Sequence, residues 1–291
     1  MRTRATLQFK VNRHLRRAGV PKWWHHFGPK KFFLADLVLG LAVKVRYQLS
    51  YRGASSFLDE YYDLKVHWTT LQKAAARLPL RLWQRVLQAT APTESMAAAI
   101  DASGFSPTNP SYHYLHRIDQ QMPRCPVKTS ILVDNDTRLI LSGRVRMKPR
   151  HDTRDVTGLV RQSRAKPWSI VMDKGYDSEK LHQQLDEKGI WSIAPPRKRC
   201  RHGRHRKVLR DSFPQGEYRY RNLVEAVFKS LKTRFGGYVR SRQARTVRAE
   251  LFLKFIMHNM MSLLRRLFLQ TRARPKPYIW SRRGRCHAGP S

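Results

Sequence analysis

Three acidic residues lie where α/β proteins carry chemistry. Asp101 follows the β-type run 97–100, Asp173 ends the apolar run 168–172, and Glu225 lies in the amphipathic stretch 218–237. Functional groups collect at strand ends and in the loops that follow them. Each acid alone is also explained as a turn, cap or surface residue. Together, clustered carboxylates repel at neutral pH, and divalent cations that stabilise them can assist an in-line phosphoryl displacement. The three acids therefore predict metal-dependent phosphoryl transfer.

The stretch 218–237 is expected to form one helix. Its apolar residues recur at the three-and-four spacing of a buried helical face: Val224, Val227, Phe228, Leu231 and Phe235. Glycines at 236 and 237 are expected to end it. A polar stripe lies beside this face and consists of Tyr218, Arg221, Glu225 and Lys232. This stripe could hold a metal ion and contact phosphate, although a solvated ladder of ion pairs is the simpler interpretation.

The charge of the chain points to a polyanionic partner. The sequence has 58 Lys and Arg against 20 Asp and Glu, a net charge of +38. Its 41% hydrophobic content supports a folded core rather than a disordered basic tail. The three separated cysteines indicate a reducing compartment. No secretory signal is visible in 1–17, and the apolar run 32–45 is shorter than the roughly 20 residues that cross a bilayer. We expect a soluble protein.

The first third of the chain is predicted to be helical. Helical patterns cover 32–48, 51–62 and 69–78, and Thr69 with Gln72 matches a capping box. The last two helices are spaced like a helix-turn-helix, whose second helix would enter the DNA major groove; an ordinary helical hairpin is the alternative. Residues 91–93 mark a boundary.

Beyond this boundary the pattern changes to strands and then to alternating strands and helices. Strand-like runs occur at 97–100, 112–118, 128–133, 138–147, 168–172 and 191–194, and helical patterns at 155–164 and 178–188. Asp177 or Ser178 is expected to cap the second of these helices. This order predicts an α/β domain with a mixed sheet.

Two basic segments remain. The block 197–210 holds eight Lys and Arg and no acid, and we expect it to contact DNA phosphates. Zinc bound by Cys200, His202 and His205 is a weaker interpretation, because these residues have no partner cluster. A long apolar helix is expected at 247–269, and the Arg-rich residues from 271 onward are expected to form a mobile tail.

Three blocks of the sequence resemble those of a known family. They are Ala-Ile-Asp101-Ala-Ser-Gly-Phe, Val-Met-Asp173-Lys-Gly-Tyr-Asp-Ser and Tyr218-x2-Arg221-x3-Glu225-x6-Lys232. They are similar to the catalytic blocks of DDE transposases from prokaryotic insertion sequences, in the group with a Tyr-Arg-Glu-Lys signature. The resemblance covers about 100–264, and 50–78 is similar to the helical region that precedes the catalytic domain in that group. The short interval between Asp173 and Glu225 predicts a compact domain without a large β-rich insertion.

The resemblance implies an RNase H-like fold with a mixed five-stranded sheet, flanked by helices and preceded by an all-helical domain. It implies that Asp101, Asp173 and Glu225 hold two Mg²⁺ ions, with Mn²⁺ as a possible substitute. It also implies that Tyr218, Arg221 and Lys232 bind DNA phosphates near the cleaved bond. Asp152 and Asp177 compete for the second acidic position; we interpret Asp177 as a helix cap and Asp152 as a loop or cap residue that could support the site.

We accordingly expect a helix-turn-helix-like DNA-binding region at 1–92, a catalytic domain at 93–270 and a basic tail at 271–291. The expected function is metal-dependent cleavage of insertion-sequence ends and strand transfer into target DNA. A catalytically inactive DNA-binding relative, or a nuclease that cuts without joining, is the alternative. The expected partner is double-stranded DNA, element ends and target alike, with a homodimer assembled on it and no membrane. The expected location is the prokaryotic cytoplasm, at the nucleoid.

Overall fold

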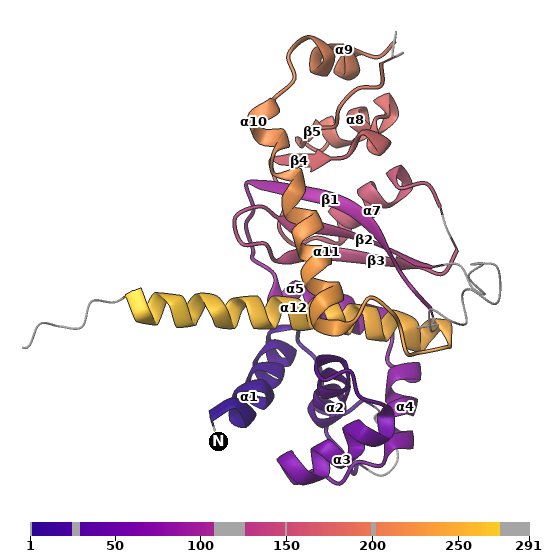
Figure 1. The fold of residues 1–291 in the computed structure, drawn as a ribbon, viewed down its shortest axis with the longest axis vertical. Coiled ribbons are helices and arrows are strands. Elements are labelled where there is room, and N and C mark those ends of the chain that lie inside the picture. Colours follow the sequence, from indigo (N-terminus) through magenta and orange to yellow (C-terminus); the bar gives the residue numbers. More distant parts are fainter. Residues whose placement is uncertain (1, 25–29, 108–125, 149, 199–201, 274–291) are drawn as a thin grey trace, which may run out of the picture.

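The computed structural model describes residues 2–24, 30–107, 126–148, 150–198 and 202–273. The N-terminal third is helical, and a five-stranded sheet with further helices follows (Figure 1). In chain order the elements are α1 (Arg2–Arg17), α2 (Leu34–Arg46), α3 (Tyr51–Tyr62), α4 (Trp68–Arg77), α5 (Leu80–Thr90), β1 (Ala97–Phe105), β2 (Val127–Asp134), β3 (Ile140–Arg146), α7 (Thr153–Gln162), β4 (Ser169–Met172), η1 (Lys174–Tyr176), α8 (Glu179–Asp186), β5 (Trp191–Ile193), α9 (Arg204–Asp211), α10 (Gln215–Tyr218), α11 (Arg221–Phe235) and α12 (Ala244–Ala273).

The sheet has the strand order β3-β2-β1-β4-β5. β1, β2 and β3 form an antiparallel meander, whereas β4 and β5 are parallel to β1 and to each other. The parallel strands are joined through helices, as parallel connections require. This is a mixed five-stranded sheet flanked by helices and preceded by helices, so the predicted fold class is confirmed.

Two hydrophobic clusters cover the two faces of the sheet. Because successive side chains of a strand point to opposite faces, neighbouring residues of β1 belong to different clusters. Ala98 and Ile100 pack with α7 and α8. Ala99 packs on the other face with α5, α11 and α12, in a cluster that continues into the N-terminal helices. The chemistry described below lies on this second face.

The long helix α12 lies between the sheet and the N-terminal helices (Figure 1). It approaches β3 so closely that a Cβ at Gly143 would lie 2.8 Å from the Phe255 ring. Asn259 is fully buried; its Oδ1 accepts the Ile140 N–H at 2.8 Å and its Nδ2 donates to the Ile140 carbonyl at 2.9 Å. These bonds satisfy backbone groups of β3, which is an edge strand. α12 thus supports the outer edge of the sheet.

The structure confirms the helices predicted around 32–48 and 51–62, but the predicted capping box is wrong. α4 begins at Trp68, and His67 is its N-cap. The Thr69 N–H donates to His67 Nδ1 at 3.4 Å, and the Thr69 hydroxyl lies 2.7 Å from the same nitrogen. His67 therefore provides the cap that the sequence pattern assigned to Thr69. Helices α1 and α5 were not predicted.

In the catalytic half, strands were found at the runs around 128–133, 138–147, 168–172 and 191–194, while the predicted strand 112–118 lies outside the described residues. Strand β1 continues to Phe105, so Asp101 lies inside it rather than after it. The predicted single helix 218–237 is wrong at its start. Tyr218 ends α10, the chain turns at 219–220, and α11 begins at Arg221.

Two further expectations differ from the structure. The basic block 197–210 contains a helix, α9, and the last helix extends from Ala244 to Ala273, beyond the predicted end at 269. The basic tail from 274 lies outside the described residues. None of the helices in the described ranges is both long enough and apolar enough to cross a membrane.

Candidate active site

Strand pairing places Asp101 and Asp173 next to each other. β1 and β4 are parallel, and Ile100 pairs with Met172 at the last position of their ladder. Asp101 and Asp173 are the next residues on these two neighbouring chains, and adjacent strands lie about 4.8 Å apart. On its other side Asp101 pairs with Ile131 of β2. Two acids far apart in the sequence are therefore juxtaposed by the crossover from β1 to β4.

Helix α11 brings the third carboxylate to the same place. Its apolar residues, including Val224 and Leu231, are buried against the sheet, which leaves Glu225 on the more exposed flank. The Arg221 guanidinium joins two of the acids: Nη2 lies 2.8 Å from Glu225 Oε1, and Nη1 lies 3.7 Å from Asp173 Oδ1. Glu225 and Asp173 therefore face one shared cation.

The electrostatics of Asp101 show that the three acids lie near one another. Burial raises the pKa of the Asp101 carboxyl above its usual value, and the negative charges of Asp173 and Glu225 raise it further. The Ala102 N–H, which donates to Asp101 Oδ1 at 2.8 Å, and the Arg221 charge act in the opposite direction. In this environment a nearby cation stabilises the ionised form of the Asp101 carboxyl.

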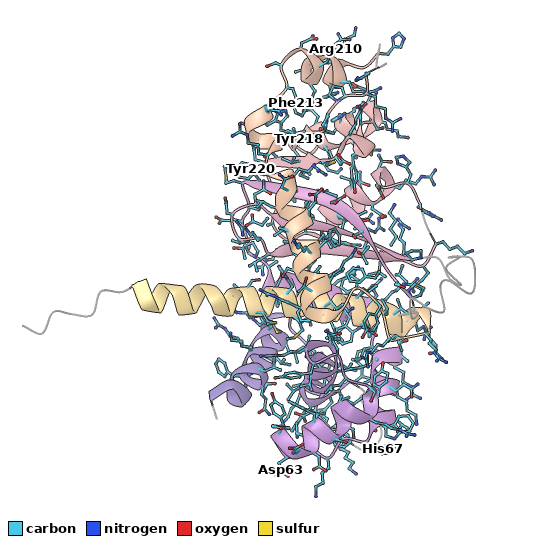
Figure 2. The ribbon with its side chains drawn as sticks, in the orientation of Figure 1. Asp63, His67, Arg210, Phe213, Tyr218 and Tyr220 are labelled. Carbon is cyan, nitrogen blue, oxygen red and sulfur yellow. The ribbon has the colours of Figure 1, made fainter. Side chains whose placement is uncertain are left out.

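The basic and phenolic residues of the predicted stripe lie around these acids. Tyr218 comes from α10 rather than α11, and its ring packs edge-to-face on Phe213 with centroids 5.2 Å apart (Figure 2). Partial burial raises the pKa of the Tyr218 hydroxyl, and Arg221 lowers it. The negative charges of Asp173 and Glu225 also raise this pKa, which places Tyr218 at the same site.

Lys232 of α11 lies beside β1, further along this strand than Asp101. Its Nζ donates to Ser103 Oγ at 2.8 Å and lies 5.7 Å from the centroid of the Phe105 ring. Ser103 is two residues beyond Asp101 on the same strand, so both side chains point to the same face of the sheet. Lys232 therefore extends the positive charge of the site along β1.

The two rival acids have other partners. Asp152 precedes α7 without capping it and forms an ion pair with Lys128. The Asp177 side chain is fully buried and bound by Arg206, so the interpretation of Asp177 as a helix cap is wrong. Ser178 holds the N-cap position of α8 and makes no side-chain cap hydrogen bond.

The structure adds one residue that sequence reasoning missed. Tyr176 is almost fully buried, and its hydroxyl has no hydrogen-bond partner among the described residues. Burial and the negative charges of Asp152, Asp101, Asp155 and Asp173 raise the pKa of its hydroxyl. The phenol therefore lies behind the candidate acids. Its position three residues after Asp173 was the available signal.

The donor set suits a hard divalent cation, because Mg²⁺ prefers carboxylate oxygens. In the ranges that the structure describes, no three His, Cys, Asp or Glu side chains form a ready-made metal cluster. Instead, the Arg221 guanidinium lies against two of the three carboxylates. The acids fit a metal by their chemistry, and Arg221 supplies positive charge at two of them.

Comparison with known proteins shows which family the protein belongs to. The fold is similar to that in a cryo-EM structure of a piggyBac transposase synaptic complex with hairpin DNA, with a TM-score of 0.50, 11% identity, and coverage of 92% of this chain and 73% of that chain. Residues 94–260 match the model of the transposase DDE domain, and this range includes all three carboxylates. Because this match covers more than half of the chain, the protein belongs to the family of transposases with a DDE domain.

Proposed function

We propose that this transposase cuts DNA and joins the freed ends to a target by phosphoryl transfer at Asp101, Asp173 and Glu225. The observation that carries the proposal is the pairing of Ile100 with Met172, which juxtaposes Asp101 and Asp173 beneath the helix that presents Glu225. Carboxylates from two strands and a helix thus converge on one face of the sheet. A convergent set of acids in a strongly basic chain suits a reaction on a polyanion.

Asp101, Asp173 and Glu225 are proposed to hold divalent cations, Mg²⁺ with Mn²⁺ as a substitute. When bound, such ions supply an activated water or 3′-hydroxyl and stabilise the charge of the phosphoryl group. Asp101 is held in place by the Ala102 N–H. Its raised pKa means that a bound cation has to compensate for burial and for two neighbouring negative charges.

Three other side chains are proposed to position the DNA phosphates. Arg221 is suited to bidentate phosphate contact, and it can exchange its carboxylate partners for a phosphate when the acids bind metal. Lys232 supplies a point charge beside Ser103. Tyr218 supplies a hydroxyl at the start of the same face. These roles agree with the Tyr-Arg-Glu-Lys signature that the sequence resembles.

The proposed partner is double-stranded DNA, both element ends and target. The net charge of +38 supports it, and the similar piggyBac transposase structure is a synaptic complex with hairpin DNA. We further propose the division at 92/93 and 270/271, a DNA-reading role for α3 and α4, and a homodimer on DNA, since two element ends need two sites. A prokaryotic insertion sequence is the proposed source.

The test is a cleavage and strand-transfer assay on plasmid DNA that carries the flanking element ends, with Mg²⁺ or with EDTA. Wild type is compared with Glu225→Gln, and Glu187→Gln is the matched control because Glu187 is an exposed residue at the end of α8. We expect joined products only with metal, from the wild type and from the control. We expect Glu225→Gln to bind DNA and to yield no product.

Other outcomes separate the alternatives. Cleaved but unjoined DNA from the wild type would indicate a nuclease that does not transfer strands. DNA binding by all three proteins without cleavage would refute catalysis and favour a DNA-binding relative. Equal products from wild type and Glu225→Gln would refute the assigned role of Glu225.

A further inference from the structure

Helix α9 divides the basic block into two faces. His205, Arg206 and Leu209 turn inward, and Leu209 is buried. Arg204, Lys207 and Arg210 are exposed and recur every three residues, so they lie along one side of the helix. We call these three residues the α9 stripe. A segment that the sequence presents as uniformly basic is therefore partly an anchor and partly an exposed surface.

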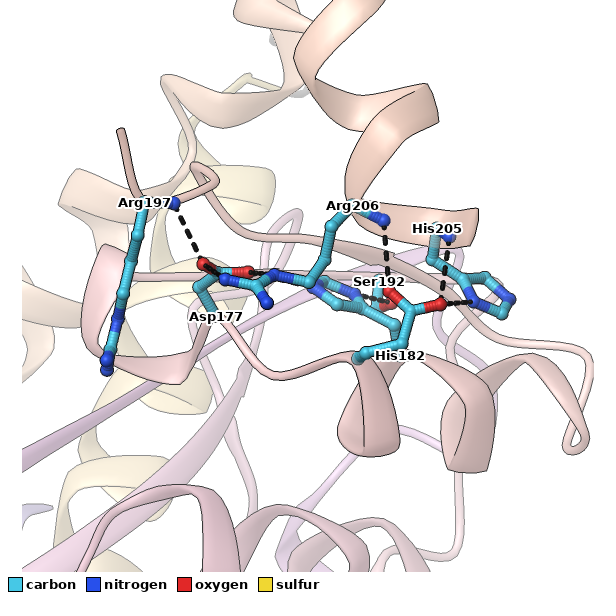
Figure 3. Close-up of polar contacts among 7 residues, drawn as sticks. Asp177, His182, Ser192, Arg197, His205 and Arg206 are labelled. Atoms are coloured by element: carbon cyan, nitrogen blue, oxygen red, sulfur yellow. Dashed lines mark hydrogen bonds and ion pairs between the residues drawn. The ribbon is translucent and has the colours of Figure 1, made fainter. Parts of the chain in front are cut away.

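The inward face is held by a buried ion pair (Figure 3). Asp177 Oδ1 accepts from Arg206 Nε at 2.8 Å, and Asp177 Oδ2 accepts from Arg206 Nη2 at 2.6 Å and from the Arg197 N–H at 2.8 Å. The Asp177 side chain is 0% exposed. A bidentate contact of this kind fixes the orientation of the guanidinium as well as its position. Arg206 thus pairs with Asp177 and holds α9 in place.

A second acid holds the start of α9. Glu179 of α8 accepts from the His205 N–H at 3.1 Å, from the Arg206 N–H at 3.2 Å and, through Oε1, contacts His205 Nδ1 at 2.9 Å (Figure 3). It therefore caps N–H groups of α9 that lack partners within the helix. Gly203 has φ 109°, and a Cβ there would collide with the Glu179 carboxylate. The contact needs glycine at this position.

These contacts make a short, highly basic helix rigid. An eight-residue helix is marginal on its own, and the adjacent cations of α9 repel one another. Asp177 and Glu179 neutralise its inner side and leave the α9 stripe facing solvent. Of the stripe, Arg210 Nε lies 3.2 Å from Asp211 Oδ1 in an exposed pair, which is weak. Arg204 and Lys207 form the strongest part of the surface.

The stripe is connected to the candidate active site by a short length of chain. α9 is followed by α10, which ends at Tyr218, and by α11, which carries Arg221 and Glu225. Figure 1 shows α9, α10 and α11 in succession from the top of the view down to the front of the sheet, and in Figure 2 Arg210, Phe213, Tyr218 and Tyr220 follow this path. DNA whose phosphate lies at the acids can continue toward α9.

We infer that the α9 stripe binds the phosphate backbone of the DNA that flanks the cleaved bond, and that Arg206, Asp177 and Glu179 are positioning residues that hold it there. The inference rests on the proposed function, because it takes DNA as the substrate. Within α9 it separates the three cations of the stripe, which contact phosphate, from Arg206, which does not. The slope of log K against log salt concentration is negative, and each phosphate contact adds about 0.9 to its magnitude.

The experiment measures the salt dependence of binding to a duplex that carries the flanking element end. Arg204→Ala/Lys207→Ala is compared with Arg164→Ala/Lys166→Ala, which removes the same charge from two exposed residues before β4, at the end of that strand opposite Asp173. We expect the α9 variant to reduce the magnitude of the slope by about 2 and the control to leave it nearly unchanged. Equal losses in both variants would overturn the inference.

The positioning role is tested with Arg206→Gln and Arg206→Lys. Although only one charge is removed, we expect Arg206→Gln to reduce the magnitude of the slope by about 2, since the stripe loses its orientation, and Arg206→Lys to restore part of it. A loss of about 1 would assign Arg206 to the phosphate contacts instead and overturn the positioning role. If Arg206→Gln does not fold, Arg204→Ala/Lys207→Ala still tests phosphate binding by the α9 stripe, and Arg206→Lys still tests the positioning role of Arg206. Absence of DNA binding by the wild type would refute the proposed function itself.

Discussion

The Arg221 guanidinium lies 2.8 Å from the Glu225 carboxylate, one turn further along α11. The same guanidinium lies 3.7 Å from Asp173 at the end of β4. A single cationic side chain thus links the helix and the strand that carry two of the three candidate ligands.

The first prediction concerns Arg221→Ala. Both ion pairs are partly exposed, so we expect a loss of less than about 1 kcal/mol in the free energy of unfolding. Strand-transfer activity is expected to fall about 100-fold or more, because a preorganised donor to phosphate is lost. Thermal unfolding and the strand-transfer assay measure the two effects. Arg219→Ala, an exposed neighbour, is the control. Equal activity losses in the two variants would refute a special role for Arg221.

The second prediction is that Asp101→Asn stabilises the protein while abolishing activity. Burial and the charges of Asp173 and Glu225 disfavour an ionised Asp101, and asparagine removes that charge while its oxygen can still accept the Ala102 N–H. We expect a gain of roughly 0.5–2 kcal/mol in the metal-free protein at neutral pH. Denaturant unfolding of wild type, Asp101→Asn and the exposed control Asp59→Asn measures it. Destabilisation by Asp101→Asn would contradict the crowding of charge at the site.

The third prediction is a pH dependence at the base of α9. The hydrogen bond to Glu179 raises the pKa of His205; burial opposes this, and Asp186 adds to the rise. Because the folded-state pKa lies above the ordinary value of 6.5, the stabilisation is fully present below pH 6.5 and is lost as the pH rises through the raised pKa. The difference in free energy of unfolding between wild type and His205→Gln should therefore shrink with rising pH. A difference independent of pH would refute the charged Glu179–His205 pair.

The fourth prediction concerns the buried pair that joins the N-terminal helices to α12. Lys44 Nζ lies 3.4 Å from Glu250 Oε2, and both side chains are almost fully buried. Glu250 also accepts from the Arg240 N–H and from the N–H and hydroxyl of Ser241. Burial raises the pKa of Glu250, but Lys44, these hydrogen bonds and Lys254 together lower it.

We expect Lys44→Met to destabilise the protein by about 3–5 kcal/mol, because it leaves a buried carboxylate without its counter-ion. The double variant Lys44→Met/Glu250→Gln should lose less than the sum of the two single variants, since neither Lys44 nor Glu250 is then left charged without the other. Chemical denaturation of the four proteins measures this coupling. Additive losses would show that Lys44 and Glu250 act independently.

Much of the fold was predictable because periodicity and turn residues act locally. The apolar run before Asp173 predicted β4, and the runs 128–133 and 138–147 predicted β2 and β3, which form a hairpin in which the Thr137 N–H donates to Asp134 Oδ2 at 2.7 Å. Where two residues compete for the same cap position, a contact with a neighbouring residue decided which one occupies it. His67 displaced Thr69 as the cap of α4, and the buried contact with Arg206 removed Asp177 from the cap of α8.

The sequence by itself indicated a polyanionic partner and the acidic residues proposed to react, because net charge and the types and spacing of acidic residues are properties of the chain. Tertiary structure alone decided that Asp101 and Asp173 are neighbours, since the register of two strands distant in sequence depends on packing on both faces of the sheet. It also decided which cations of the basic block are exposed. Arg206 faces inward because the chain between η1 and α8 places Asp177 there, a contact between residues 29 positions apart that no local pattern reveals.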